Sequence, residues 1–276
     1  MPFQVPSCRL LGVGSNKYKE NAVKRPGHHV SLLACAAISM LFCQNASARI
    51  TVACAANMQY AMEELKNSAA AKGDSIQAVY GASGNLLTQI KNGAPFDIFL
   101  SADEACPESL WTSGEAASPP EVYAYGKLVL WTIKPINLQP GLAALFDSAV
   151  RTIAVPDPKI APYGKAAMAA LAKAGIYSRV ASRLVFGENI GQTAQYIVTG
   201  AADAGFNAEA IVLSRPMKGK GTWTVIDSAL YPPIAQAAVL CRFGKEHHDG
   251  EAQRFMAFLY SANGRALLAR YGFRTP

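Results

Sequence analysis

Short apolar strands that run directly into helices through small residues constrain this chain more than any other feature of its sequence. The clearest case is residues 78–93 (AVYGASGNLLTQIKNG), where an extended segment reaches Gly-Ala-Ser-Gly and continues as an amphipathic helix. Such a helix points unpaired backbone N–H groups and the positive end of its dipole at whatever lies before Ser83. The junction therefore predicts an anion-binding position; the structural alternative is that Ser83 simply caps the helix.

The same alternation of strand and helix recurs along the chain. We expect strands at residues 50–56, 75–80, 96–103, 152–155, 184–186, 202–206 and 223–226. We expect helices to follow most of them, beginning after Asn57, at Ser83, near Asp103, and at Tyr163, Ile190 and Asn207, with two more at 250–262 and 264–271. Alternation of this kind indicates an α/β fold with parallel sheets.

Two longer extended segments interrupt this alternation. They cover residues 122–132, which include Gly126, and residues 232–241. One leaves the first group of elements and the other returns to it, so we expect two α/β lobes joined by two hinge strands. The predicted boundaries are 49–127 with 234–276 for lobe I, and 128–233 for lobe II.

The first 48 residues differ in kind from the rest. A basic start precedes a 14-residue apolar run, residues 30–43, and the small residues Ala46-Ser-Ala48 follow it. The run is shorter than the ~20 residues that a membrane span needs. This pattern predicts a signal peptide, residues 1–48, cleaved after Ala48, and export of the remaining chain. A short membrane anchor and a lipoprotein acylated at Cys35 are the weaker alternatives, the second because Cys35 lies at the beginning of the apolar run.

Charge and cysteine content narrow the function of the remaining chain. Five of the 26 basic and one of the 19 acidic residues precede residue 49, so the mature chain carries a net charge of only +3. Nucleic acid is therefore not an expected partner. Three cysteines remain, Cys54, Cys106 and Cys241, which allow at most one disulfide. Cys54 and Cys241 lie in apolar strand patterns, so we expect them to be small buried hydrophobic residues.

Four helix N-termini carry the functional prediction. They lie at Asn57, which we place at an N-cap, at Ser83, at Tyr163 and at Ile190, two in each predicted lobe. Ligands bind at the carboxyl ends of parallel strands, so these four positions should converge. They offer backbone N–H groups, an amide, a hydroxyl and a phenol, with no Lys, Arg or metal ligand. Such neutral donors suit a fully ionised dianion.

Several short motifs resemble those of one family of transport proteins. They are AANM (55–58), YGASGNL (80–86), NGAPFDIFLSAD (92–103), AVPDPKIAPYG (154–164), ADAGF (202–206), YPPIAQAAVL (231–240) and RYGF (270–273). Over residues 49–276 the chain resembles the periplasmic molybdate-binding proteins of molybdate ABC transporters. The resemblance implies a two-lobed type II periplasmic-binding fold and a monomer that delivers molybdate, and tungstate as well, to an inner-membrane ABC permease. It implies no enzyme activity, cofactor or metal site beyond the oxyanion itself.

The resemblance also assigns ligand contacts position by position. Asn57 replaces a Ser found in some members, Ser83 matches directly, Tyr163 falls where some members offer only a backbone amide, and Ile190 falls at a backbone donor that is usually Val. One departure is Ala208, where some members place a ligand Tyr. Tyr163 is expected to compensate for that hydroxyl, with a half-buried packing tyrosine as the alternative.

Three other classes of protein were weighed against this one. A hydrolase or dinucleotide enzyme is disfavoured because the sequence has no G-x-S-x-G or G-x-G-x-x-G motif, and His247 and His248 are not spaced for a triad or a metal. A transcription regulator would carry a helix-turn-helix where this chain has its signal peptide. A binding protein for sulfate, another oxyanion or a small organic acid stays open.

Overall fold

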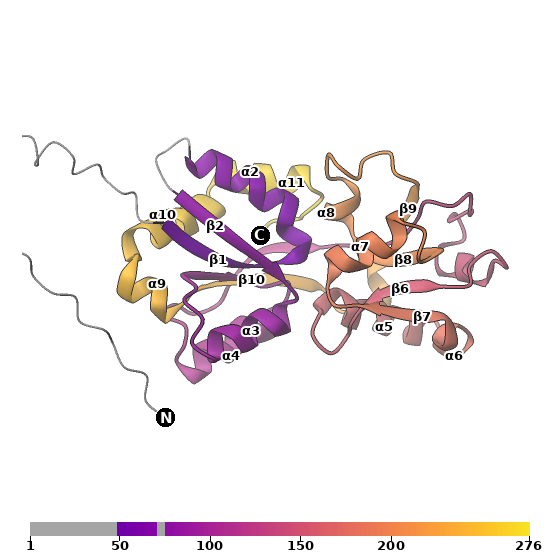
Figure 1. The fold of residues 1–276 in the computed structure, drawn as a ribbon, viewed down its shortest axis with the longest axis horizontal. Coiled ribbons are helices and arrows are strands. Elements are labelled where there is room, and N and C mark those ends of the chain that lie inside the picture. The colour runs from indigo at the N-terminus through magenta and orange to yellow at the C-terminus, as the bar shows by residue number, and fades with distance from the viewer. Residues whose placement is uncertain (1–48, 71–74) are drawn as a thin grey trace, which may run out of the picture. The chain divides into compact units, whose positions relative to one another are not determined.

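The computed structural model describes residues 49–70 and 75–276 of the chain (Figure 1). The predicted signal peptide, residues 1–48, lies outside the described residues. None of the helices within the described ranges has the length and the apolar character needed to cross a bilayer.

The first of two five-stranded sheets has the strand order β2-β1-β3-β10-β4. Its strands are β1 (Arg49–Ala55), β2 (Ser75–Gly81), β3 (Ile98–Leu100), β4 (Glu121–Gly126) and β10 (Ile234–Leu240). β1 is parallel to β2 and β3, whereas β10 is antiparallel to β3 and β4. The sheet is thus mixed: its strand–helix units β1, β2 and β3 are parallel, as predicted, whereas β10 returns from the other sheet and does not follow a crossover helix.

The second sheet has the strand order β7-β6-β8-β5-β9. Its strands are β5 (Leu128–Thr132), β6 (Ile153–Pro156), β7 (Leu184–Gly187), β8 (Ala204–Ala208) and β9 (Thr222–Val225). β6 is parallel to β7 and β8, while β5 is antiparallel to β8 and β9. Both sheets therefore combine a parallel part, built from strand–helix units, with strands that enter from the connecting segments.

Helices cover both faces of each sheet (Figure 1). The α-helices are α2 (Gln59–Ala70), α3 (Ser83–Lys91), α4 (Ala105–Ser113), α5 (Pro162–Lys173), α6 (Tyr177–Val180), α7 (Ile190–Val198), α8 (Glu209–Val212), α9 (Arg242–His247), α10 (Asp249–Tyr260) and α11 (Ala262–Arg270). Short 3-10 helices are η1 (Ala56–Met58), η2 (Gly141–Phe146), η3 (Ala181–Arg183) and η4 (Ser228–Leu230). α2 and α11 lie on one face of the first sheet and α3 and α4 on the other, as α7 and α5 do for the second.

Successive side chains along the strands of the first sheet pack into two separate hydrophobic cores. Val52 and Cys54 pack into the core under α2, α10 and α11, whereas Ala53 packs on the opposite face with α3 and α4. The period of two along β1 explains this division, since successive side chains of a strand point to opposite faces. Cys54, Cys106 and Cys241 are all buried and free, as expected of small hydrophobic residues.

The chain passes between the sheets at two places. The extended run 122–132 is in fact two strands in different sheets, because β4 ends at Gly126 and β5 begins at Leu128. The return passes through residues 226–233 and enters β10, where Ile234 lies opposite Gly126. The lobe boundaries drawn from the sequence stay a prediction.

Some predicted element bounds were wrong. Asn207 does not begin a helix: it lies in β8, and α8 begins at Glu209. The strand expected over residues 96–103 is only β3. Helix α9, directly after Cys241, was not predicted at all. Buried side-chain hydrogen bonds explain the first error, since Asn207 is fully buried and its amide binds neighbouring backbone.

Candidate functional site

Asn57, Ser83, Tyr163 and Ile190 come together around one small cavity, as the sequence predicted. The cavity lies between the ends of the two sheets, and its empty space, including the part open to solvent, amounts to about 220 Å³. Its lining consists of Ala55, Ala56, Asn57, Gly81, Ala82, Ser83, Ala102, Ala161, Pro162, Tyr163, Asn189 and Ile190. No residue of this lining is Lys, Arg, His, Asp or Glu.

Strand ends bring these residues together. β1 and β2 of the first sheet finish at Ala55 and Gly81, and the chain turns there into η1 and α3. β6 and β7 of the second sheet lead to α5 and α7. Carboxyl ends of parallel strands are the usual ligand position in open α/β sheets. Three helices of nine to twelve residues therefore begin at one cavity.

Ser83 is the first residue of α3 and not its cap. The capping position is Ala82, which makes no side-chain cap bond, so the alternative of an ordinary N-cap serine is wrong. The Ser83 hydroxyl is 1% exposed, and its oxygen accepts the backbone N–H of Ala102 at 3.0 Å. Because the oxygen already accepts a hydrogen, its own proton is left to donate toward the cavity.

Asn57 occupies a different position from the predicted N-cap. It lies in the middle of η1, whose cap is Ala55, because β1 ends in a tight 3-10 turn before α2 begins. The side chain is buried, and Nδ2 donates to Oε1 of Gln236 at 2.8 Å. Asn57 thus donates one amide hydrogen to Gln236, and its side chain also interacts with the hydroxyl of Tyr163.

Tyr163 is buried in the first turn of α5. Its hydroxyl oxygen accepts Nε2 of Gln236 at 3.4 Å, so it contacts a strand of the first sheet although α5 packs on the second. Burial is the main cause that raises the pKa of Tyr163 far above its ordinary value. The hydroxyl therefore stays neutral and protonated across the physiological range of pH. The packing alternative for this residue was a half-buried ring, and at 1% exposure the side chain is more enclosed than that.

Ile190 is the first residue of α7, which is capped by Asn189. The Asn189 side chain accepts the N–H of Gln192 at 3.0 Å. The Ile190 carbonyl accepts Nδ2 of Asn207 at 3.3 Å, and Asn207 is fully buried. Asn207 thereby supports the start of α7 from β8. One feature of the sequence marks Asn207, which is a polar residue directly after the apolar stretch Ala-Gly-Phe.

Backbone N–H groups complete the set of donors. Among the residues that the structure describes, no acceptor pairs with the amides of Ser83, Tyr163 and Ile190. These are the first amides of three helices, which have no partner inside the helix. They add oriented partial positive charge to a cavity that lacks any formal charge.

Two contacts close the cavity between the sheets. The N–H of Gly84 donates to the carbonyl of Ile160 at 3.0 Å, and Nδ2 of Asn85 donates to Oε1 of Glu188 at 3.1 Å. A Cβ on residue 84 would lie 3.1 Å from Cα and O of Ile160. Glycine at position 84 therefore allows the backbones of the two sheets' connecting segments to meet.

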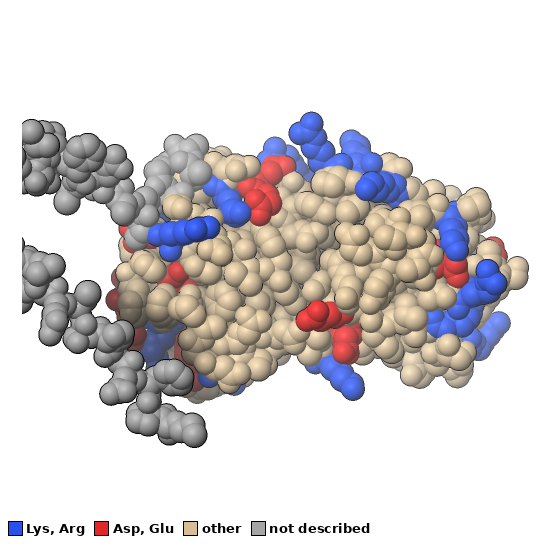
Figure 2. Space-filling view, viewed as in Figure 1, with Lys and Arg blue, Asp and Glu red and all other residues tan. Residues whose placement is uncertain are grey.

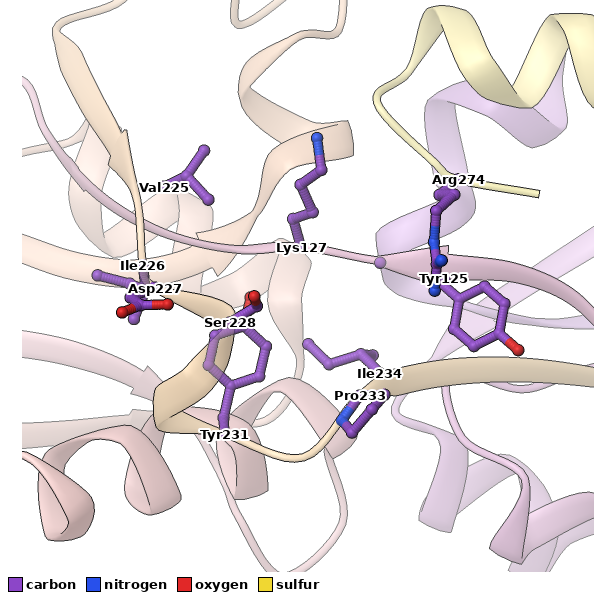
Figure 3. Close-up of a pocket in the computed structure, with 11 residues that line it drawn as sticks. Tyr125, Lys127, Val225, Ile226, Asp227, Ser228, Tyr231, Pro233, Ile234 and Arg274 are labelled. Atoms are coloured by element: carbon purple, nitrogen blue, oxygen red, sulfur yellow. The ribbon is translucent and has the colours of Figure 1, made fainter. Parts of the chain in front are cut away.

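A larger hollow lies elsewhere along the connecting strands (Figure 3). Its empty space, including the part open to solvent, amounts to about 1250 Å³, and its lining includes Lys127, Asp227 and Arg274. Arg274 stacks on Tyr125, with 4.4 Å between the guanidinium carbon and the ring centroid. Its charges of both signs and its width do not match a small dianion, and none of the four predicted residues lines it.

Charge is also sparse on the face of the molecule shown in Figure 2. Most of the face in Figure 2 carries neither basic nor acidic side chains, and it has no continuous basic patch. Within the described residues, no three or more His, Cys, Asp or Glu side chains gather in a way that could hold a metal ion. The donors of the small cavity are therefore the chemical feature that remains to be explained.

Comparison with known proteins bears directly on that cavity. Residues 50–274 match the family of bacterial extracellular solute-binding proteins. The chain is 35% identical to the molybdate-binding protein of Azotobacter vinelandii over 85% of this chain and 93% of that one. It is 34% identical to the molybdate-binding protein of Rhodobacter capsulatus over 83% and 90%. The solved periplasmic molybdate-binding protein of Azotobacter vinelandii superimposes with a TM-score of 0.77 at 33% identity, covering 82% of this chain and 99% of that one.

The family match, the identities and the fold agree with one another. Both sheets and the cavity between them belong to the two-lobed periplasmic-binding fold that the resemblance implied. Members of this family are the binding components of transporters, so the protein is not an enzyme. The chain belongs to the bacterial extracellular solute-binding proteins and, within them, to the family of periplasmic molybdate-binding proteins.

Proposed function

We propose that this protein captures molybdate in the periplasm, between its two lobes, and delivers it to an ABC importer in the inner membrane. The observation that carries the proposal is the small cavity lined by hydroxyl, amide and backbone donors and by no charged side chain. The two relatives of more than 30% identity that bear the name molybdate-binding protein support the same ligand.

The physical argument rests on what a dianion needs when it leaves water. Several oriented N–H and O–H groups replace its hydration shell, and hydrogen bonds to a charged acceptor are stronger than neutral ones. A cation in the cavity is not required for this. A protonated anion such as hydrogen phosphate would need an acceptor, and no carboxylate lines the cavity. The cavity therefore favours a fully ionised tetrahedral oxyanion.

We assign the contacts to the four residues predicted from the sequence. Ser83 donates its hydroxyl, Asn57 its second amide hydrogen, and Tyr163 its hydroxyl together with its backbone N–H. Ile190 donates only its backbone N–H, because its side chain is apolar. No cofactor and no separate metal ion take part.

Further parts of the proposal concern ligand range and location. Tungstate, which has the same charge and shape as molybdate, should bind the same donors. Residues 1–48 act as a signal peptide, and the exported protein works as a monomer with no nucleic-acid partner. Sulfate, another oxyanion or a small organic acid is the alternative ligand.

Thermal unfolding with a panel of anions tests this function. A ligand that binds only the folded state stabilises it by about 2.7 kcal/mol at a hundredfold excess over Kd. We expect molybdate and tungstate to raise the midpoint of the purified protein and phosphate to leave it unchanged. If only sulfate or an organic acid raised the midpoint, that compound would replace molybdate as the proposed ligand. If none of the tetrahedral dianions raised it, an oxyanion function would be refuted.

A further inference from the structure

Gln236 is the one glutamine in the long apolar strand β10, and its side chain is completely buried. The register between β10 and β4 shifts between Gln236 and Ala237, where a β-bulge interrupts the ladder. Bulges re-aim side chains and often lie next to binding sites. A buried polar side chain at such a position needs partners for both ends of its amide.

Those partners come from both sides of the cavity. Oε1 of Gln236 accepts Nδ2 of Asn57 at 2.8 Å and the hydroxyl of Tyr123 at 3.1 Å. Nε2 donates to the hydroxyl oxygen of Tyr163 at 3.4 Å. The glutamine therefore joins one proposed ligand residue on η1 of the first sheet to another on α5 of the second.

The directions of these hydrogen bonds determine which hydrogens remain available to a ligand in the cavity. The Nε2 group of Gln236 can only donate hydrogen bonds, so the Tyr163 oxygen acts as the acceptor in this pair. The Tyr163 proton must therefore be donated to a different atom. Among the described residues the Tyr163 hydroxyl has no acceptor of its own. Asn57 donates one amide hydrogen to Gln236, and its side chain also interacts with the Tyr163 hydroxyl. The Tyr163 proton is thus left for an acceptor in the cavity, and the orientation of the Asn57 amide is set by the same glutamine.

Gly126 provides the room for this arrangement. A Cβ at residue 126 would collide with the Tyr163 hydroxyl and would lie 2.7 Å from Nε2 of Gln236. Gly126 is the last residue of β4, immediately before the chain crosses to the second sheet. Only a residue without a side chain lets the hydroxyl of Tyr163 reach Gln236 at this crossing.

We propose that Gln236 is a positioning residue that fixes the donor direction of Asn57 and Tyr163, so that both present a hydrogen to the bound oxyanion. The inference rests on the proposed function and adds a residue that does not itself line the cavity. Tyr123 completes the arrangement, since its hydroxyl contacts both Gln236 and the carbonyl of Ser101, each at 3.1 Å.

A double-mutant cycle with sodium molybdate tests the inference. The wild type, Gln236→Met, Tyr163→Phe and the double variant are titrated by calorimetry. Each single change should weaken binding about tenfold or more, the worth of a hydrogen bond to a charged group. Gln236 acts through Tyr163 and Asn57, so the effects of the two substitutions should overlap. The fold-loss of molybdate affinity in the double variant should therefore be much smaller than the product of the two single losses. Tyr260→Phe, whose hydroxyl binds Glu121 far from the cavity lining, is the matched control and should bind like the wild type.

Gly126→Ala provides a second route that removes no polar group. Its Cβ must displace the Tyr163 hydroxyl from Gln236, so molybdate binding should fall about as far as in Tyr163→Phe, roughly tenfold. A spectroscopic readout accompanies both routes: molybdate should change the near-UV tyrosine spectrum of the wild type, and this change should be lost in Tyr163→Phe and reduced in Gln236→Met.

The outcomes separate this inference from the proposed function. Equal molybdate affinity of the wild type, Gln236→Met and Gly126→Ala would overturn the role of Gln236 and leave the function intact. Losses that multiply in the double variant would also overturn it, because they would mean that Gln236 acts independently of Tyr163. A wild type that binds no molybdate would overturn the function and this inference together.

Discussion

The substitution Ser83→Ala tests the assignment of the α3 N-terminus to the oxyanion. It removes one oxygen, which accepts the N–H of Ala102 at 3.0 Å and whose proton is assigned to the oxyanion. A hydrogen bond to a charged acceptor contributes about 1.5 to 3 kcal/mol. Binding of molybdate should therefore weaken roughly tenfold to a hundredfold.

The stability of the ligand-free protein should also fall, for a separate reason. Ser83 is not a helix cap, so no capping energy is lost. The Ala102 N–H instead loses its acceptor in a buried environment, which costs about 1 to 3 kcal/mol. Calorimetric titration with molybdate measures the first effect, and urea unfolding without ligand measures the second.

A matched control comes from another buried serine. Ser214 is completely buried, and its hydroxyl donates to the carbonyl of Ile211 at 2.6 Å, away from the cavity lining. Ser214→Ala should cost stability without changing molybdate affinity. If Ser83→Ala binds molybdate as tightly as the wild type and Ser214→Ala do, then Ser83 is not a ligand and the assignment of α3 to the anion is wrong.

Three further predictions concern other parts of the chain. Ile190→Val should leave molybdate affinity nearly unchanged in the same titration, because its donor is the backbone, and should cost about 0.5 to 1.5 kcal/mol of stability from the lost methylene; a large loss of affinity would contradict the backbone assignment. Burial raises the pKa of Asp203, but the hydrogen bonds that its carboxylate accepts outweigh this effect and lower the pKa. These bonds come from Lys134 and from the N–H groups of Arg151 and Thr152. Because the pKa of Asp203 is lower in the folded than in the unfolded protein, its carboxylate stabilises the fold at pH values above its unfolded pKa of about 4. This contribution is lost as the pH falls through the pKa of the folded protein. Asp203→Asn should therefore reduce the urea midpoint at pH 7 and lose this difference in acid, and an effect that persisted unchanged at low pH would disprove the linkage. Mass spectrometry of the exported protein should give a chain that begins at Arg49, and a chain that retains residues 30–48 would exclude cleavage after Ala48.

The local features of the site followed from the sequence because strand ends and helix starts are encoded by short stretches. Gly-Ala-Ser-Gly at residues 81–84 and the polar turn before Ile190 both mark a helix N-terminus in their own neighbourhood. In an α/β fold the carboxyl ends of parallel strands then bring such junctions together. Ser83 and Ile190 were located in this way without any knowledge of their partners.

Features that depend on distant contacts did not follow from the sequence. Gln236 and Asn57 are 179 residues apart, and no local pattern indicates that their side chains meet. The antiparallel course of β10 and β5 depends on where the connecting segments enter each sheet. Asn57 was placed at a cap because a 3-10 turn and an N-cap share the same small polar residues. Gln236 carried one signal, a lone polar residue in an apolar strand, which marks a buried hydrogen bond but not its partner.

Titration of the purified protein with sodium molybdate tests the central claim most directly. The account predicts saturation at one molybdate per chain, competition by tungstate and no competition by phosphate. It also predicts that Ser83→Ala lowers the affinity while the stoichiometry stays at one. Absence of saturable molybdate binding, or binding that Ser83→Ala, Asn57→Ala and Tyr163→Phe all leave unchanged, would contradict the assignment of this cavity to the oxyanion.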